Sequence, residues 1–281
     1  MDVFISADME GVSGVTAAAD VVRGTDSYEY GQDRMHDDVN AAIAGAFDGG
    51  ASSVLVNDSH SSMRNLEADR LDDRAALIRG STKPRSMMQG LEPTHDVACF
   101  VGYHAMAGTP EAVLNHTFYG HELIELAVNG TPVGELGWNA RFAGALGVPV
   151  GLVTGDQATA SEADTTVPTA RTVTVKTAAD RFSARCRPVA ETAAAIRDAA
   201  KRAIIDAASG SLEVLAPPPE SVTISAEWVT TNYALAAAGA PGVDRLDGRT
   251  TAVTAEDYQT AFDDSVGMLR AASGGANEYF G

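Results

Sequence analysis

Acidic residues and histidines follow several apolar stretches of this sequence, in positions where they could bind a metal ion. VFISA leads to Asp8 and Glu10, SSVLVN to His60, VACFVG to His104, and the turn after LIELAVNG to Glu135. Asp8 and Glu10 are two residues apart, so their carboxylates point to the same side of an extended segment. Two such carboxylates repel each other unless a proton or a cation lies between them. The spacing therefore favours a cation site.

Three carboxylates combined with two imidazoles suit zinc or a similar divalent metal, and contain too much nitrogen for magnesium or calcium. Five ligands are more than one tetrahedral zinc ion normally takes. If Asp8 bridges, two ions can share the set and leave positions open for water. Two metals about 3.5–4 Å apart lower the pKa of such a water and polarise a carbonyl group. The set therefore predicts metal-assisted hydrolysis.

Each of these motifs taken alone also has a structural interpretation. Asp58 and Ser59 could merely stabilise the turn after their strand. We interpret His36, on an acidic helix face, and His95, in a Pro-Thr loop, as structural residues. The role of His121, between a glycine and a glutamate, stays open. Only the joint position of the four motifs favours a metal site.

The elements that must position these residues alternate between apolar strands and helical stretches. Strands are predicted at VFISA, SSVLVND, VACFVGY, LIELAVNG and VPVGLVTG, with helices over 35–47 and 134–146. This alternation predicts an α/β fold with a largely parallel sheet flanked by helices. Ligands of such sheets bind at the carboxyl ends of the strands, which is where the polar motifs fall.

The composition changes after about residue 156. RTVTVKTA, SVTISAEW and TAVTA predict further strands, and an alanine-rich helix is expected over 188–208. We therefore expect a metal-binding catalytic α/β domain over 1–156 and a smaller C-terminal α/β domain over 157–281. The second domain carries no ligand motif, so it is expected to supply a substrate wall or oligomer contacts.

The charge and the apolar pattern exclude several classes of partner. Thirty-eight acidic residues against 20 basic ones give a formal net charge of −18, which disfavours nucleic-acid binding because phosphates are repelled. No run of 18 apolar residues predicts a membrane span, and no secretory signal is visible. The two cysteines, Cys99 and Cys186, form no metal-binding spacing. A cytoplasmic location is expected.

The acidic surplus has two interpretations. The basic residues comprise 17 arginines and only 3 lysines, and aspartate outnumbers glutamate by 23 to 15. GC-rich codon usage with ordinary acidic solubility explains such a bias. Adaptation to a salty cytoplasm explains it as well, because a dense acidic surface stays hydrated there and its self-repulsion is screened. The sequence leaves both interpretations open.

Four segments, SADMEGVSG, VLVNDSHSSMRNL, GYHAMAGTP and PVGELGWNA, closely resemble those of the DppA-type D-aminopeptidases. The resemblance covers most of the first 160 residues and is weaker beyond them. It implies a peptidase with two zinc ions per chain. The zinc ligands of the family fall on Asp8, Glu10, His60, His104 and Glu135. It also implies a homodecamer of two stacked pentamers.

The resemblance further places a catalytic histidine on His116, in VLNHTFYG. The stretch between His104 and His116 is one residue longer than the family pattern, and Asn115 stands where the family has serine, so His121 remains an alternative. A histidine beside the metals can donate a proton or a hydrogen bond as a tetrahedral intermediate forms and collapses.

The function expected from these observations is zinc-dependent hydrolysis of the N-terminal residue of a short peptide. The preference for a D-residue follows from the resemblance alone. One alternative is a binuclear amidase or phosphoesterase that acts on another small substrate. Another is a metal-dependent peptide-binding or assembly protein without catalysis, which the complete ligand set disfavours.

Overall fold

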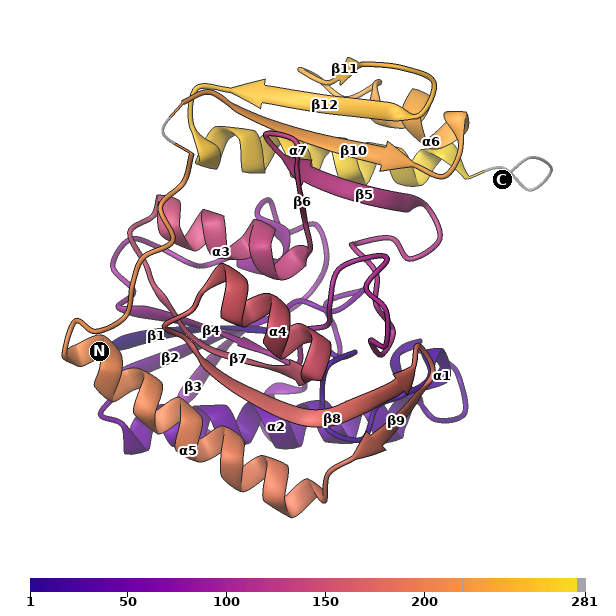
Figure 1. Ribbon diagram of the computed structural model, residues 1–281. Coiled ribbons are helices and arrows are strands. Elements are labelled where there is room, and N and C mark those ends of the chain that lie inside the picture. Colours follow the sequence, from indigo (N-terminus) through magenta and orange to yellow (C-terminus); the bar gives the residue numbers. More distant parts are fainter. Residues whose placement is uncertain (219, 277–281) are drawn as a thin grey trace.

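The computed structural model describes residues 1–218 and 220–276, which form two sheets with helices packed between and around them (Figure 1). The first sheet has seven strands in the order β3-β2-β1-β4-β7-β8-β9. Neighbouring strands pair parallel except β8 and β9. Its strands are β1 (Asp2–Ala7), β2 (Ser53–Asp58), β3 (Ala75–Ile78), β4 (Val97–Val101), β7 (Val150–Asp156), β8 (Arg171–Asp180) and β9 (Ser183–Cys186). The predicted α/β fold with a largely parallel sheet is confirmed.

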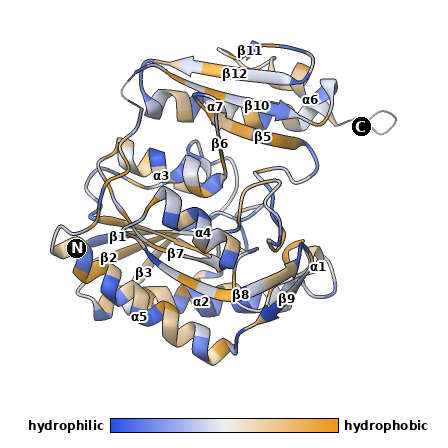
Figure 2. Cartoon of the chain, in the orientation of Figure 1, coloured by the Kyte–Doolittle hydropathy of each residue, from blue (hydrophilic) through white to orange (hydrophobic). Residues whose placement is uncertain are grey.

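Helices cover both faces of this sheet, which is why its central strands are apolar throughout. Every residue of β4 and β7 is buried, as expected for parallel strands between two helical layers, and the central strands are mostly hydrophobic in Figure 2. On one face α2 (Tyr28–Asp48) packs against α5 (Val189–Ala208). They approach closely at Gly45, where an added Cβ would lie 2.2 Å from the Arg197 carbonyl oxygen. The other face carries α3 (Glu135–Ala145) and α4 (Gln157–Thr166) (Figure 1).

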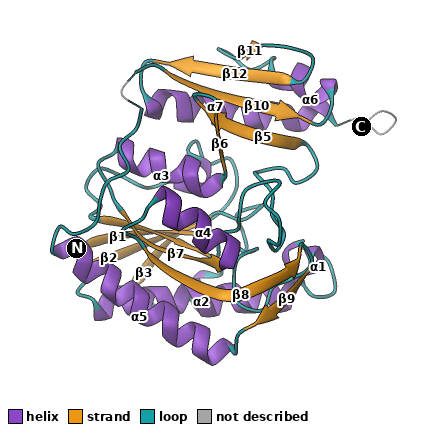
Figure 3. Ribbon diagram, in the orientation of Figure 1, coloured by secondary structure: helices purple, strands orange, loops and turns teal. Residues whose placement is uncertain are grey.

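The second sheet is antiparallel, with the strand order β11-β12-β10-β5-β6. Figure 3 shows it above α3, with α7 between the sheet and the rest of the molecule. The aromatic side chains of α3 and α7 join the two layers: Trp138 stacks on Phe262 with ring centroids 3.7 Å apart. The strands and helices of this second layer are β5 (Leu123–Val128), β6 (Thr131–Val133), β10 (Val222–Trp228), β11 (Asp244–Arg245), β12 (Thr250–Ala255), α6 (Thr231–Ala237) and α7 (Tyr258–Ala272).

The two sheets do not follow the expected division of the chain into 1–156 and 157–281. β5 and β6, from the first half, pair within the antiparallel sheet. β8, β9 and α5, from the second half, complete the parallel sheet and its helical layer. The strand LIELAVNG was located correctly, but its alternating pattern cannot specify which sheet it joins. Each layer is therefore built from both halves of the chain.

The remaining short elements are the helix α1 (Ala18–Val21) and three 3₁₀ turns at Ala68–Arg70, Ser86–Met88 and Ser273–Gly275. Between β4 and β5 the chain runs without helix or strand over 102–122, part of the loop region drawn in Figure 3. Within the described residues, no helix has the length and apolar character needed to cross a membrane.

Candidate metal centre

Three adjacent strands, β2, β1 and β4, deliver polar residues to one edge of the parallel sheet. Their registers place Ala7 beside both Asp58 and Val101, so the three strands end at the same level. Asp8 and Glu10 follow β1, His60 follows β2, and His104 follows β4. This is the carboxyl edge at which α/β sheets bind ligands.

The fifth residue, Glu135, reaches the centre by another route. It does not follow a strand of the parallel sheet, because the strand before it belongs to the β5–β6 hairpin of the second sheet. Glu135 is instead the first residue of α3 and accepts a hydrogen bond from the Phe118 backbone N–H at 2.6 Å. A negative charge is favourable at this helix position.

All five residues expected as ligands lie together, with side chains at most 7% exposed. Nδ1 of His60 lies 3.2 Å from Asp8 Oδ1 and 2.9 Å from Glu10 Oε2. Nε2 of His104 lies 3.5 Å from both Asp8 Oδ2 and Glu135 Oε1. They line a cavity of about 260 Å³. The structure thus brings the whole expected set to one place.

Three histidines of this cluster bond in the same way, since each donates one ring N–H to a backbone carbonyl. His60 Nε2 donates to the Val21 carbonyl at 2.8 Å, His104 Nδ1 to the Ala105 carbonyl at 3.1 Å, and His116 Nδ1 to the Leu114 carbonyl at 2.8 Å. A carbonyl only accepts, so each of these ring nitrogens carries the proton. In a neutral imidazole the other nitrogen is then an acceptor, and in each case it faces carboxylate oxygens. Acceptors facing acceptors require a cation between them, and histidines that bind metals are oriented in this way.

The electrostatics of the buried carboxylates lead to the same conclusion. Among the described residues, Asp8 Oδ2 and Glu10 Oε2 have no hydrogen-bond partner, although the Glu10 oxygen is close to His60. Burial and the charge of Glu10 raise the pKa of Asp8 to about 7. Burial alone would lower the pKa of His104, but Glu135 and then Asp8 raise it to about 10. The cluster thus requires compensating positive charge, from protons or from metal ions, and its donors fit a divalent metal.

Possible ligand atoms within 4.8 Å of one another form two overlapping groups. One comprises Asp8, Glu10 and His104, and the other comprises His104, His116 and Glu135. His116 was expected to act beside the metals, and its ring stacks on that of His104 with centroids 4.0 Å apart. Its Nε2 lies 3.9 Å from Glu135 Oε1 and 4.0 Å from Glu10 Oε1. A second ion and a proton-transfer group would compete for this position.

The other polar residues of the motifs have structural contacts. Asp58 accepts hydrogen bonds from the backbone N–H groups of Asn65 and Leu66 at 2.5 and 2.8 Å, and so stabilises the loop that carries His60. His36 bonds to backbone atoms of Gln32 and Glu67. His95 bonds only to the nearby Glu92, and the side chain of His121 is exposed.

Sequence reasoning did not identify Lys176, which supports the loop that carries Glu10. This fully buried lysine of β8 donates to the backbone carbonyls of Glu10, Val12 and Val15 at 2.6, 2.9 and 2.7 Å. Burial lowers its pKa to about 8. A lysine within a predicted strand carries no signal of such a role, because its partners are backbone atoms far away in sequence.

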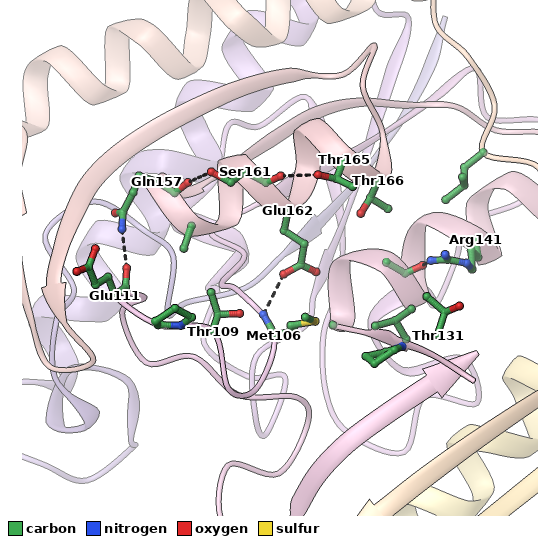
Figure 4. Close-up of a pocket in the computed structure, with 17 residues that line it drawn as sticks. Met106, Thr109, Glu111, Thr131, Arg141, Gln157, Ser161, Glu162, Thr165 and Thr166 are labelled. Atoms are coloured by element: carbon green, nitrogen blue, oxygen red, sulfur yellow. Dashed lines mark hydrogen bonds between the residues drawn. The ribbon is translucent and has the colours of Figure 1, made fainter. Parts of the chain in front are cut away.

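A second, larger cavity of about 640 Å³ is lined by residues of α3, α4 and β6 (Figure 4). Glu162 of α4 points into it and accepts a hydrogen bond from the Met106 backbone N–H at 2.9 Å. Met106 and Gly134, which also line it, lie close in sequence to His104 and Glu135. Neither of the two possible metal-binding groups in the described chain lies in this cavity. The residues that line this cavity therefore flank the segments that carry the cluster. Metal binding is expected in the smaller cavity.

Comparisons with known proteins agree over nearly the whole chain. A family model described as Peptidase M55, D-aminopeptidase, matches residues 1–264. A D-aminopeptidase of Bacillus subtilis (strain 168) is 38% identical over 251 residues, which cover 89% of this chain and 90% of that protein. A solved structure, "Zn-dependent D-aminopeptidase DppA from Bacillus subtilis, a self-compartmentalizing protease", matches with a TM-score of 0.89 at 36% identity. That match covers 97% of this chain and 98% of the other.

Proposed function

Because this chain belongs to the Peptidase M55 family of D-aminopeptidases, we propose that its carboxylate and histidine cluster is a zinc centre that removes the N-terminal residue from short peptides. The solved relative is described as zinc-dependent. The observation that supports the proposal most strongly is that three histidines each bond a backbone carbonyl through one ring nitrogen and turn the other ring nitrogen toward buried carboxylates.

We assign the metal ligands to Asp8, Glu10, His60, His104 and Glu135, with two zinc ions per chain. Two groups of possible ligand atoms, which share His104, support a pair of ions. His60 is in neither group, but its Nδ1 lies 3.2 Å from an Asp8 oxygen and 2.9 Å from a Glu10 oxygen. The bound ions would activate a water molecule and polarise the peptide carbonyl. Neutral imidazoles and ionised carboxylates are the forms that bind metal. The backbone carbonyls that accept from His60 and His104 hold each ring in the tautomer required.

His116 is assigned the proton-transfer role in this scheme. Its Nδ1–H is held by the Leu114 carbonyl, which leaves Nε2 available to accept or deliver a proton at the scissile bond. Burial, followed by the neighbouring His104, lowers its pKa below the usual value of 6.5. The ring is therefore neutral at neutral pH and suited to act first as a base.

The free amino group of the substrate would be held by a metal or by an acidic residue in the cavity. The preference for a D-residue is supported by the family alone. The apolar walls of the cavity, which include Met87, Phe118 and Leu269, would contact the substrate side chain.

The test is to load the purified chain with zinc, measure the metal content, and assay matched D- and L-aminoacyl peptides. We expect two zinc ions per chain and hydrolysis of the D-peptides at a rate well above that of the L-peptides. An N-acetylated D-peptide is the matched control, and it should not be cleaved because it lacks the free amino group. Active protein with less than one metal per chain would overturn the two-zinc proposal.

We also propose the assembly and the location expected from the sequence. The solved relative is described as self-compartmentalizing, which supports an oligomer, and the family resemblance implies a homodecamer of two stacked pentamers. Light scattering should then give a mass near ten times the 29.1 kDa of the chain. The free thiols of Cys99 and Cys186 are compatible with a reducing cytoplasm.

A further inference from the structure

Helix α7 forms part of the wall of the metal cavity, although it belongs to the second sheet layer. Val266, Leu269 and Arg270 line the cavity, and their spacing of three and four residues places them on one face of the helix. Val266 and Leu269 are buried, whereas Arg270 is exposed at the end of the helix. This face therefore offers the cavity an apolar wall that ends in a positive charge.

A hydrogen bond holds Arg270 beside the cavity. Its Nη2 donates a hydrogen bond to the Lys83 carbonyl. Its guanidinium also lies close enough to Tyr119, another residue of the wall, to oppose the rise that burial causes in the pKa of that phenol. A guanidinium has five N–H donors. Donors not used by the Lys83 carbonyl remain available to a substrate.

The charged side chains around the cavity fall into two sets. Among the described residues that line it, Arg270 is the only arginine or lysine, while Asp8, Glu10 and Glu135 all belong to the metal cluster. With the carboxylates used by the metals, Arg270 is the charged side chain of this wall that remains to pair with a substrate, and a short peptide offers it a terminal carboxylate. The cavity volume of about 260 Å³ is just below the usual range for small-molecule sites, which suits a substrate of very few residues.

We propose that Arg270 binds the free C-terminal carboxylate of the substrate and thereby selects short peptides with an unmodified C-terminus. This inference rests on the proposed aminopeptidase function. The amino end is held at the metal cluster, the first side chain contacts the apolar wall, and the carboxylate pairs with the guanidinium. Arginine suits this role because its planar fork of donors matches a carboxylate.

The experiment compares two substrates on the zinc-loaded full chain: D-alanyl-D-alanine and its C-terminal amide. Both have the same scissile bond, and only the first has a terminal carboxylate. Since a hydrogen bond to a charged group is worth a factor of about 10 to 100, kcat/KM for the acid should exceed that for the amide by about this factor. The preference should appear mainly in KM, because the contact is present in both the ground state and the transition state.

Arg270→Gln removes the charge but keeps a donor for the Lys83 carbonyl, so it should abolish the preference by lowering kcat/KM for the acid toward that for the amide. Arg270→Lys keeps the charge without the fork and should retain part of the preference, which a purely structural role would not predict. Arg202→Met, on the exposed face of α5 and paired only with Asp198, is the matched control and should keep the full preference. Metal content and circular dichroism are measured on every sample.

Three results would overturn the inference: equal hydrolysis of acid and amide by the wild-type chain, a preference that survives in Arg270→Gln, or an equal loss in Arg270→Gln and Arg270→Lys. If Arg270→Gln fails to fold, the wild-type ratio and Arg270→Lys still decide. Failure of the proposed function is distinguishable, because the zinc-loaded wild-type chain would then hydrolyse neither substrate.

Discussion

Replacing His116 by alanine tests whether this residue transfers protons or binds metal. Its side chain is 18% exposed and its Nε2 lies about 4 Å from two carboxylates of the cluster, so both roles are geometrically accessible. A positioned acid–base group contributes a factor of about 10²–10⁴, equivalent to about 3–5 kcal/mol of the activation barrier. We therefore expect His116→Ala to keep both metal ions and lose this factor in kcat, with little change in KM.

The pH profile gives an independent measure of the same role. Burial and His104 lower the pKa of His116, so it becomes protonated only below its usual value of 6.5. The wild-type kcat should fall as pH decreases through that lower value, because the protonated ring can no longer accept a proton. His116→Ala should lack this acid limb.

His121→Ala is the matched control, since His121 lies on the same loop as His116, is not a proposed ligand, and has an exposed side chain. It should retain activity within about twofold. Metal content and rates are measured on the same samples by elemental analysis and by release of the free amino acid. Near-normal turnover in His116→Ala with both metals retained would refute the proton-transfer role. Loss of one ion from that variant would make His116 a ligand instead.

Three further expectations follow from the charges of the molecule. Asp8→Asn should lose much of the bound metal and essentially all activity, whereas His60→Ala should lose chiefly one ion; full metal content in Asp8→Asn would contradict a bridging role. If the net charge of −18 reflects a salty cytoplasm, the melting temperature should rise steeply from low to molar KCl, and a flat or falling curve would leave the codon-usage explanation. Burial raises the pKa of Asp38 from 3.8 to about 6 against its hydrogen bonds from Ser13. The stability associated with this raised pKa is present below pH 3.8 and is lost as pH rises through 6. The free energy of unfolding of the wild type should therefore fall by about 3 kcal/mol relative to that of Asp38→Asn between pH 4 and 7. Denaturant titrations of both proteins measure this difference, and parallel curves would exclude it.

Much of the fold was predictable because its strands are apolar on both faces and its long helices have clear ends. The predicted strands coincide with β1, β2, β4, β5 and β7, and the alanine-rich helix expected over 188–208 corresponds to α5 (Val189–Ala208). The short edge strand β3 and the two-residue β11 were missed, since few of their residues are buried. The resemblance to the D-aminopeptidases, carried by four motifs, was confirmed over residues 1–264.

The grouping of the candidate site was predictable from the sequence because four of its residues follow three strands that end at one level. Glu135 was identified correctly as a neighbour of the cluster. That the strands before it belong to the second sheet was not predicted, because the pairing partners of a strand are set by long-range contacts. The wall formed by α7 could not be predicted either. Arg270 lies on an amphipathic helix, and nothing in its local sequence distinguishes a residue at a cavity from one on an ordinary surface.

The exchange of segments between the two sheets has a consequence for synthesis on the ribosome, where the chain emerges from its N-terminus. All five proposed ligands have appeared once residue 135 is made, but β7 and β8 of the parallel sheet are not yet made, and the β5–β6 hairpin lacks its neighbour β10. The cavity wall comes later still, with α7 at Tyr258–Ala272. The metal-binding side chains are therefore synthesised well before the α7 wall that lines their cavity in the folded chain.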